Sequence, residues 1–207
     1  MRQYCAGTLA QVQQVQTAHA ASFQEVLTQR RQSVCVAPLF ALVELGHKID
    51  LPNDAFDDPH IRRLEILAIE ITLLHNDLLS YCKEEEEGVP HNAVMACRMQ
   101  GMGVQEAVDF LGQEVSHRME SFENATCQLK KSGHGHLGEM MRYVQGVADV
   151  VKANLYWSFK SDRFLSPQQK SRLRTAGTLE VAINVPCGYR QDAVLPTLGL
   201  GQESTMD

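Results

Sequence analysis

The stretch HIRRLEILAIEITLLHNDLLSYCKEEEE, residues 60–87, contains no glycine or proline and repeats apolar residues at helical spacing. These residues cover most of the circumference of a helix, which is typical of a helix that is buried on several sides. The segment therefore predicts the long central helix of a bundle. Its apolar positions are Ile61, Leu64, Ile66, Leu67, Ile69, Ile71, Leu73 and Leu74.

The segments on either side of this central helix also have helical patterns. Asp57 or Asp58 offers an N-cap before Pro59, and Gly88 and Pro90 follow the last glutamate. The other helical patterns cover residues 8 to about 29, 37–48, 89–100, 104–131 and 137–164, with a short last helix after Ser166 and Pro167.

The C-terminal end of the chain differs in character from the rest. From Gly177 onward the helical period is lost and glycine and proline recur, which is typical of a poorly ordered end. No β-hairpin or βαβ pattern precedes residue 178. We therefore predict an all-α fold, with one helical domain over residues 1–176 and a poorly ordered tail over residues 177–207.

Composition narrows the function. The chain has 207 residues and a net charge of −6, which gives no basic surface for nucleic acid. No apolar run approaches the roughly 20 residues that span a bilayer, and the N-terminal residues lack a signal-peptide pattern. Six cysteines are scattered without a CxxC pair, as expected in a reducing compartment. A cytoplasmic protein is predicted.

Three oxygen-bearing residues, Asn76, Ser80 and Glu84, recur at steps of four on the central helix. On a helix they line a stripe about 80° wide. Such hard oxygen ligands suit Mg²⁺, but a solvated helix face produces the same spacing. The apolar body of this helix favours a ligand, because burying polar groups without partners costs several kcal/mol.

The segment NDLLSYCKE, residues 76–84, resembles the N-D-x-x-S-x-x-x-E metal motif of class I terpene synthases, in particular the fungal sesquiterpene synthase type. Three other stretches agree with it in order and spacing. TQRRQSVCVAPLFALVE resembles the diphosphate-sensor segment of that family, with Arg30 at the sensor position. VPHNAVMA resembles the segment after the metal helix, and NLYWSFKSDRF resembles a late W-S-x-x-S-x-R-Y signature.

The resemblance implies a set of site residues and a reaction. Mg²⁺ and basic groups would neutralise the diphosphate that leaves a prenyl diphosphate, with farnesyl diphosphate as the expected substrate. An apolar cavity would then fold the carbocation, and the product would be a terpene hydrocarbon or alcohol. No acid–base catalytic residue is implied. The implied residues are Asn76, Ser80 and Glu84 for Mg²⁺, Arg30, Lys83 and Arg163 for the diphosphate, and Trp157, Tyr156 and Phe159 for the cavity wall.

The chain departs from the family before Arg30. Family members carry an aspartate-rich motif upstream of the sensor arginine, whereas Glu25 is the single acidic residue among residues 1–29. We therefore expect the chain to be the C-terminal portion of a synthase, a partial class I terpene synthase bundle.

In such a portion, apolar faces around residues 39–45 and 61–74 should be exposed, which favours pairing with another chain, for example as a homodimer. The alternative function is a non-catalytic helical fragment that at most binds diphosphate or a partner chain.

Overall fold

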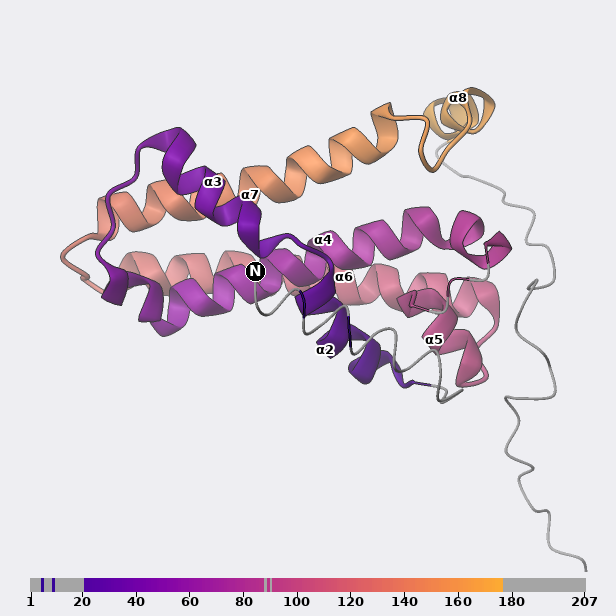
Figure 1. Ribbon diagram of the computed structural model, residues 1–207, viewed down its shortest axis with the longest axis horizontal. Helices are drawn as coiled ribbons and strands as arrows, with labels where there is room; N and C mark the ends of the chain where they lie inside the picture. Colours follow the sequence, from indigo (N-terminus) through magenta and orange to yellow (C-terminus); the bar gives the residue numbers. More distant parts are fainter. Residues whose placement is uncertain (1–4, 6–8, 10–20, 88, 90, 177–207) are drawn as a thin grey trace, which may run out of the picture.

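The computed structural model describes residues 5, 9, 21–87, 89 and 91–176 of the chain. None of these residues lies in a β-strand, so the prediction of an all-α fold is confirmed (Figure 1). Among the described helices, none has both the length and the apolar character needed to cross a membrane. The elements are α2 (Phe23–Ser33), α3 (Ala37–His47), the 3₁₀ helix η1 (Asn53–Asp57), α4 (Pro59–Glu86), α5 (Ala93–Met99), α6 (Val104–Lys131), α7 (Leu137–Lys160) and α8 (Pro167–Ala176).

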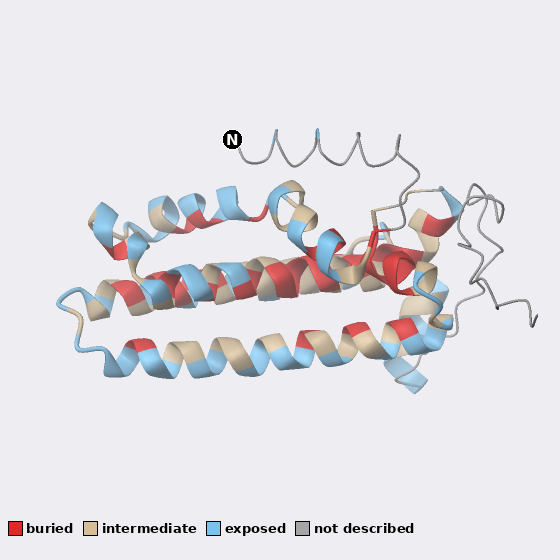
Figure 2. Ribbon diagram, turned by 90° about the horizontal axis from the view of Figure 1, so that it is seen from below, coloured by how far each residue is buried: buried red, intermediate tan, exposed pale blue. Residues whose placement is uncertain are grey.

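Helix α4 is the centre of the bundle, as its apolar pattern predicted. It packs against α2, α5, α6 and α7, and its buried residues occur along most of its length, whereas α6 is buried along one edge (Figure 2). The expectation that the face over residues 61–74 is exposed is wrong, because these neighbouring helices cover it. Among the large apolar residues of that face, Ile66 is 37% exposed and Ile69 is partly buried, and the others are buried.

The start of α4 is fixed by Asp58. Its carboxylate accepts hydrogen bonds from the backbone N–H groups of His60 at 2.7 Å and Ile61 at 3.3 Å, and Pro59 is the first helical residue. Asp57 instead forms an ion pair with Arg62. Of the two candidate caps, Asp58 therefore takes the role, because its side chain reaches the free N–H groups of the first turn.

The N-terminal helical pattern is interrupted. Residues 8 to about 29 were predicted as one helix, but Ala21 and Ser22 are not helical and α2 begins at Phe23. Ser22 caps α2 through a reciprocal pair of hydrogen bonds with Glu25, at 2.8 Å and 3.3 Å. This capping box starts a helix at Phe23, although the helical pattern of the sequence continues across this point. Residues 10–20 of the pattern lie outside the described residues.

The last long helix is shorter than its pattern. Helix α7 was predicted over residues 137–164 but ends at Lys160, because Ser161 has an extended backbone. The short helix predicted after Ser166 and Pro167 is present as α8. The tail predicted to be poorly ordered, residues 177–207, lies outside the described residues.

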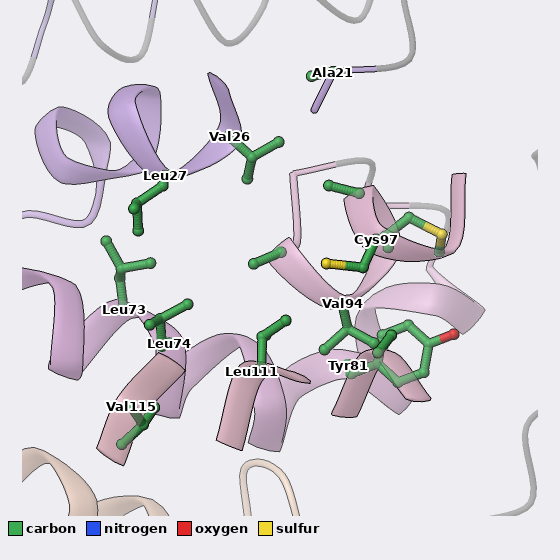
Figure 3. Packing of buried hydrophobic residues seen from close by; sticks show 14 residues of the cluster. Ala21, Val26, Leu27, Leu73, Leu74, Tyr81, Val94, Cys97, Leu111 and Val115 are labelled. Atoms are coloured by element: carbon green, nitrogen blue, oxygen red, sulfur yellow. The ribbon is translucent and has the colours of Figure 1, made fainter. Parts of the chain in front are cut away.

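Two apolar clusters fill the bundle. In the first, α2 and α5 pack on the C-terminal half of α4 and the start of α6, through residues such as Leu27, Leu74, Val94 and Leu111 (Figure 3). The second joins α3 and α7 to the N-terminal half of α4 and the end of α6. Helices α2, α3, α5, α6 and α7 therefore each contribute apolar residues to a cluster shared with α4, whereas α8 has no buried residue.

Helix α3 also presents leucines to the surface. Leu39, Leu42 and Leu45 have exposed fractions of 39%, 59% and 76%, so the exposure expected around residues 39–45 is confirmed. The opposite side of α3, with Phe40 and Val43, packs on α7. One helix thus carries apolar residues on two faces, of which the bundle covers one.

The contact between α3 and α7 depends on a glycine. A Cβ atom added at Gly146 would lie 2.2 Å from Cγ1 of Val43, a buried β-branched side chain with little freedom to move. We predict that Gly146→Ala lowers the free energy of unfolding by about 1–3 kcal/mol, because the two helices must separate. The matched control is Gly112→Ala in α6, where a Cβ meets nothing within 4 Å.

The control variant should be neutral or more stable by up to about 1 kcal/mol, because alanine favours a helix over glycine. Urea unfolding followed by circular dichroism measures both variants. Equal stability of the two variants would contradict the close approach of α3 and α7.

Candidate metal and diphosphate site

The predicted metal ligands Asn76, Ser80 and Glu84 lie on the C-terminal half of α4. Ser80 has no exposed surface, and its Oγ atom has no hydrogen-bond partner. Asn76 and Glu84 are half-buried. A buried hydroxyl without a partner is unusual, because it has lost its hydrogen bonds to water without replacement. The stripe is therefore not a solvated helix face.

The other two side chains of the stripe already hold one protein partner each. Arg30 donates from Nη2 to Asn76 Oδ1 at 3.3 Å, and Asn92 donates from Nδ2 to Glu84 Oε2 at 3.0 Å. An amide oxygen and a carboxylate have further lone pairs, so both remain able to coordinate a cation. An amide, a hydroxyl and a carboxylate fit the oxygen chemistry of Mg²⁺, which keeps other positions for water or phosphate.

The set does not resemble a site for softer metals. Among the described residues, no group of three or more histidine, cysteine, aspartate or glutamate side chains could hold a metal ion. Glu84 is the one carboxylate of the stripe. A site with a single carboxylate binds a divalent cation best when an anionic ligand supplies the remaining charge.

Asp77, next to the stripe, connects three helices. It has no exposed surface, forms an ion pair with Arg30 of α2, and accepts a hydrogen bond at Oδ2 from the backbone N–H of Ala93 in α5, at 2.8 Å. Burial raises the pKa of this carboxyl to about 6, against the opposing effects of Arg30 and Ala93. The sequence interpretation assigned no role to Asp77.

Arg30, the predicted diphosphate ligand, thus lies beside the stripe and contacts Asn76. Its side chain is 14% exposed, and its Nε atom is buried without a hydrogen-bond partner. The neighbouring Arg31 forms an ion pair with Glu70, which also pairs with Arg118 of α6 at 2.5 Å. Arg30 and Arg31 therefore hold the end of α2 against α4 through two different carboxylates, Asp77 and Glu70.

Lys83 and Arg163, the other predicted diphosphate ligands, lie in more open positions. Lys83 is on α4 beside the stripe, and its ammonium group is 3.5 Å from the Glu87 carboxylate. Arg163 is exposed after α7, with its guanidinium 5.4 Å from the centre of the Phe164 ring. Among the described residues, no hydrogen bond or ion pair joins Arg163 to the stripe. Their diphosphate role stays a prediction.

The predicted cavity residues lie at the C-terminal end of α7. Tyr156, Trp157 and Phe159 are 66%, 50% and 37% exposed, and Trp157 packs edge-to-face on Phe164 at 6.3 Å between ring centres. Of the three, Trp157 borders a groove of about 510 Å³ between α3 and α7. The groove is lined mainly by apolar side chains, among them Leu39, Leu42, Val43, Val150 and Ala153.

The structure adds two residues to which the sequence interpretation gave no role, Asp77 and Asn92. Asp77 lies inside the motif, but the sequence interpretation assigned the metal ion to Asn76, Ser80 and Glu84. Asn92 had a signal of its own: it follows Pro90 and precedes an apolar run, which is typical of a helix N-cap. It does cap α5, by accepting a hydrogen bond from the N–H of Val94 at 2.8 Å.

Comparison with known proteins places this geometry in a family. The model of the family described as "Terpene synthase family 2, C-terminal metal binding" matches residues 1–121. The chain belongs to the terpene synthase family. Helix α4, with the predicted metal ligands, and Arg30 of α2, the predicted diphosphate ligand, both lie inside the matched range.

The similar proteins are fungal and bacterial terpene synthases. Silphinene synthase of Penicillium patulum is 34% identical over 81% of this chain and 45% of its own length. Cycloaraneosene synthase of Sordaria araneosa is 36% identical over 73% of this chain and 42% of its own. The chain therefore spans about half the length of the curated relatives it matches.

Solved structures of terpene synthases share the fold. A linalool/nerolidol synthase of Streptomyces clavuligerus, in complex with 2-fluorogeranyl diphosphate, has a TM-score of 0.72 and 21% identity, over 78% of this chain and 56% of that one.

The role of Asp77 in this chain can be tested by replacing aspartate with asparagine at Asp77 and, as a control, at Asp58 of the same helix. We predict that Asp77→Asn lowers the free energy of unfolding by about 3 kcal/mol, because Arg30 loses its charged partner and the amide cannot accept both hydrogen bonds. Asp58→Asn should cost less than about 1 kcal/mol, because asparagine caps helices as well as aspartate. Denaturant unfolding at neutral pH compares them, and equal losses would contradict the bridging role of Asp77.

Proposed function

We propose that this chain carries the metal- and diphosphate-binding part of a Mg²⁺-dependent sesquiterpene cyclase that acts on farnesyl diphosphate. The observation that carries the proposal is the buried, unpartnered Ser80 hydroxyl between Asn76 and Glu84, with Arg30 beside it. The names of the relatives support a terpene product, and the 2-fluorogeranyl diphosphate bound to the bacterial neighbour supports a prenyl diphosphate as the substrate class.

The residues of the stripe would hold the cation. Asn76, Ser80 and Glu84 supply three neutral or anionic oxygens from one helix face. When bound there, Mg²⁺ supplies positive charge that stabilises the departing diphosphate. The protein contributes by holding these oxygens on a rigid, buried helix, so that little reorganisation accompanies binding.

Arg30 would bind the diphosphate itself. A guanidinium donates two parallel hydrogen bonds to phosphate oxygens, and the Nε of Arg30 is buried without a partner. Asp77 holds the guanidinium in place from the other side. Ionisation breaks the bond between the prenyl carbon and the diphosphate oxygen, which keeps the electron pair, and Arg30 would stabilise the resulting negative charge. Lys83 and Arg163 are proposed to add charge at the rim.

The apolar surface of α3 and α7 would face the prenyl chain. The groove lined by Leu39, Leu42 and Trp157 is mainly apolar and open to solvent, so it would exclude water from a carbocation only once further apolar surface covers it. The ring faces of Trp157, Tyr156 and Phe159 would stabilise positive charge by cation–π attraction. The exposure of these rings leaves room for further apolar surface to complete the cavity.

A second function is favoured by the exposed leucines of α3. The leucines of α3 could instead bind another protein chain, such as a second copy of this one, in a fragment without turnover. Leu42 and Leu45 are more than half exposed, as an interface residue in a free chain would be. This alternative keeps diphosphate binding but predicts assembly without chemistry.

The test combines binding and turnover. We predict that the purified chain binds inorganic diphosphate in a Mg²⁺-dependent manner by titration calorimetry, and that Asn76→Ala removes this binding. With farnesyl diphosphate and Mg²⁺, terpene and diphosphate release should also vanish in that variant. Glu84→Gln should weaken binding at least tenfold. The matched control is Glu86→Gln, which changes an exposed residue outside the stripe and should leave binding unchanged.

The outcomes separate the two functions. Binding with turnover supports the cyclase. Binding without turnover, in a chain that sediments as a dimer, supports the alternative. Equal loss of binding in Glu84→Gln and Glu86→Gln, or no binding by the folded wild-type chain, would contradict the metal–diphosphate site.

A further inference from the structure

Asn92 connects the proposed metal site to the next helix. It is 1% exposed and precedes α5, with an extended backbone. Its Nδ2 atom donates one hydrogen bond to the backbone carbonyl oxygen of Asp77, at 2.8 Å, and the other to Glu84 Oε2, at 3.0 Å. Its Oδ1 atom accepts from the N–H of Val94 at 2.8 Å. Both amide hydrogens and the amide oxygen are therefore used.

The orientation of this amide is fixed by its surroundings. The opposite orientation would place the amide oxygen against two acceptors, the Asp77 carbonyl and the Glu84 carboxylate, and would place the NH₂ group against the Val94 N–H. It would turn three attractive contacts into three repulsive ones. Aspartate at this position would have no donor, and glutamine would carry an extra methylene in a fully buried place.

The position of Glu84 explains why such a donor matters. Glu84 is in the last turn of α4, where the helix dipole is negative, and Glu85, Glu86 and Glu87 follow it. A free carboxylate there would turn toward solvent to reduce the repulsion. The N–H of Asn92 holds one of its oxygens, and the same amide is anchored on the backbone of α4 at Asp77, two turns earlier.

We propose that Asn92 is a positioning residue for the metal site: its side-chain NH₂ group holds the Glu84 carboxylate in register with Asn76 and Ser80. This inference rests on the proposed function, because it takes Glu84 as a metal ligand. Partners of this kind orient the ligands of metal sites, and their loss typically weakens metal binding about 10–100-fold.

The test separates positioning from helix capping. Asn92→Ser keeps an oxygen that caps α5 but is too short to reach Glu84, whereas Asn92→Ala loses both roles. Mn²⁺ binding in the presence of inorganic diphosphate is measured by the loss of the electron paramagnetic resonance signal of free Mn²⁺. We expect both variants to bind Mn²⁺ about 10–100-fold more weakly than the wild type, while the midpoint of thermal unfolding falls further in Asn92→Ala than in Asn92→Ser.

Two other results would overturn the inference. Wild-type Mn²⁺ affinity in Asn92→Ser, with Asn76→Ala unable to bind, would make Asn92 a helix cap alone and leave the proposed function intact. No Mn²⁺ binding by the folded wild-type chain, or equal binding by Asn76→Ala, would reject the proposed function and this inference with it.

Discussion

A carboxylate without exposed surface, that of Asp77, is the constraint on which the site depends. A buried charge is stable only with partners, and this one takes them from two other helices, Arg30 of α2 and the Ala93 N–H of α5. Neither helix can move away from α4 without removing one of the two partners of this buried carboxylate. The interaction therefore fixes Arg30 beside Asn76 and fixes the residues that lead into α5.

The polar groups of α4 divide according to their partners. Glu70 and Asp77 are satisfied by arginines, and Glu85 is satisfied by Tyr81 and Arg98. Ser80 lies between these anchored positions and has none. Structural ion pairs thus hold the helix rigid on several sides, while the face with Asn76, Ser80 and Glu84 keeps unused oxygen lone pairs. Thr72 Oγ1 and His75 Nδ1 of α4 also lack a hydrogen-bond partner, so the mark of a ligand site is the place of Ser80 between two other oxygen-bearing side chains of one helix face.

Much of the fold could be predicted from the sequence, because the apolar period of residues 60–87 is long and its caps are local. Asp58 and Pro59 start α4 through contacts within one turn, so the local sequence is enough to predict them. The break before Phe23 was missed because the run of alanine and glutamine masked the Ser22–Glu25 capping box. The apolar pattern of residues 61–74 indicated burial, but the helices that cover them could not be predicted, since these depend on where α6 and α7 pack.

The candidate site could be predicted in part for the same reason. The spacing of Asn76, Ser80 and Glu84 lies within one helix, so the stripe follows from helical geometry alone. The contacts of Asp77 and Asn92 join separate helices, and nothing in their local sequence states which backbone group they meet. The aromatic end of α7 is likewise visible as a pattern, but its distance from the stripe is set by the packing of the bundle.

The most direct test of the metal–diphosphate site is a crystal structure of the chain grown with Mn²⁺ and inorganic diphosphate, with an anomalous difference map collected for manganese. We expect an anomalous peak bound by Asn76 Oδ1, Ser80 Oγ and the Glu84 carboxylate, with diphosphate between this ion and Arg30. A diphosphate or Mn²⁺ bound only elsewhere, with the Ser80 hydroxyl still unpartnered, would contradict it.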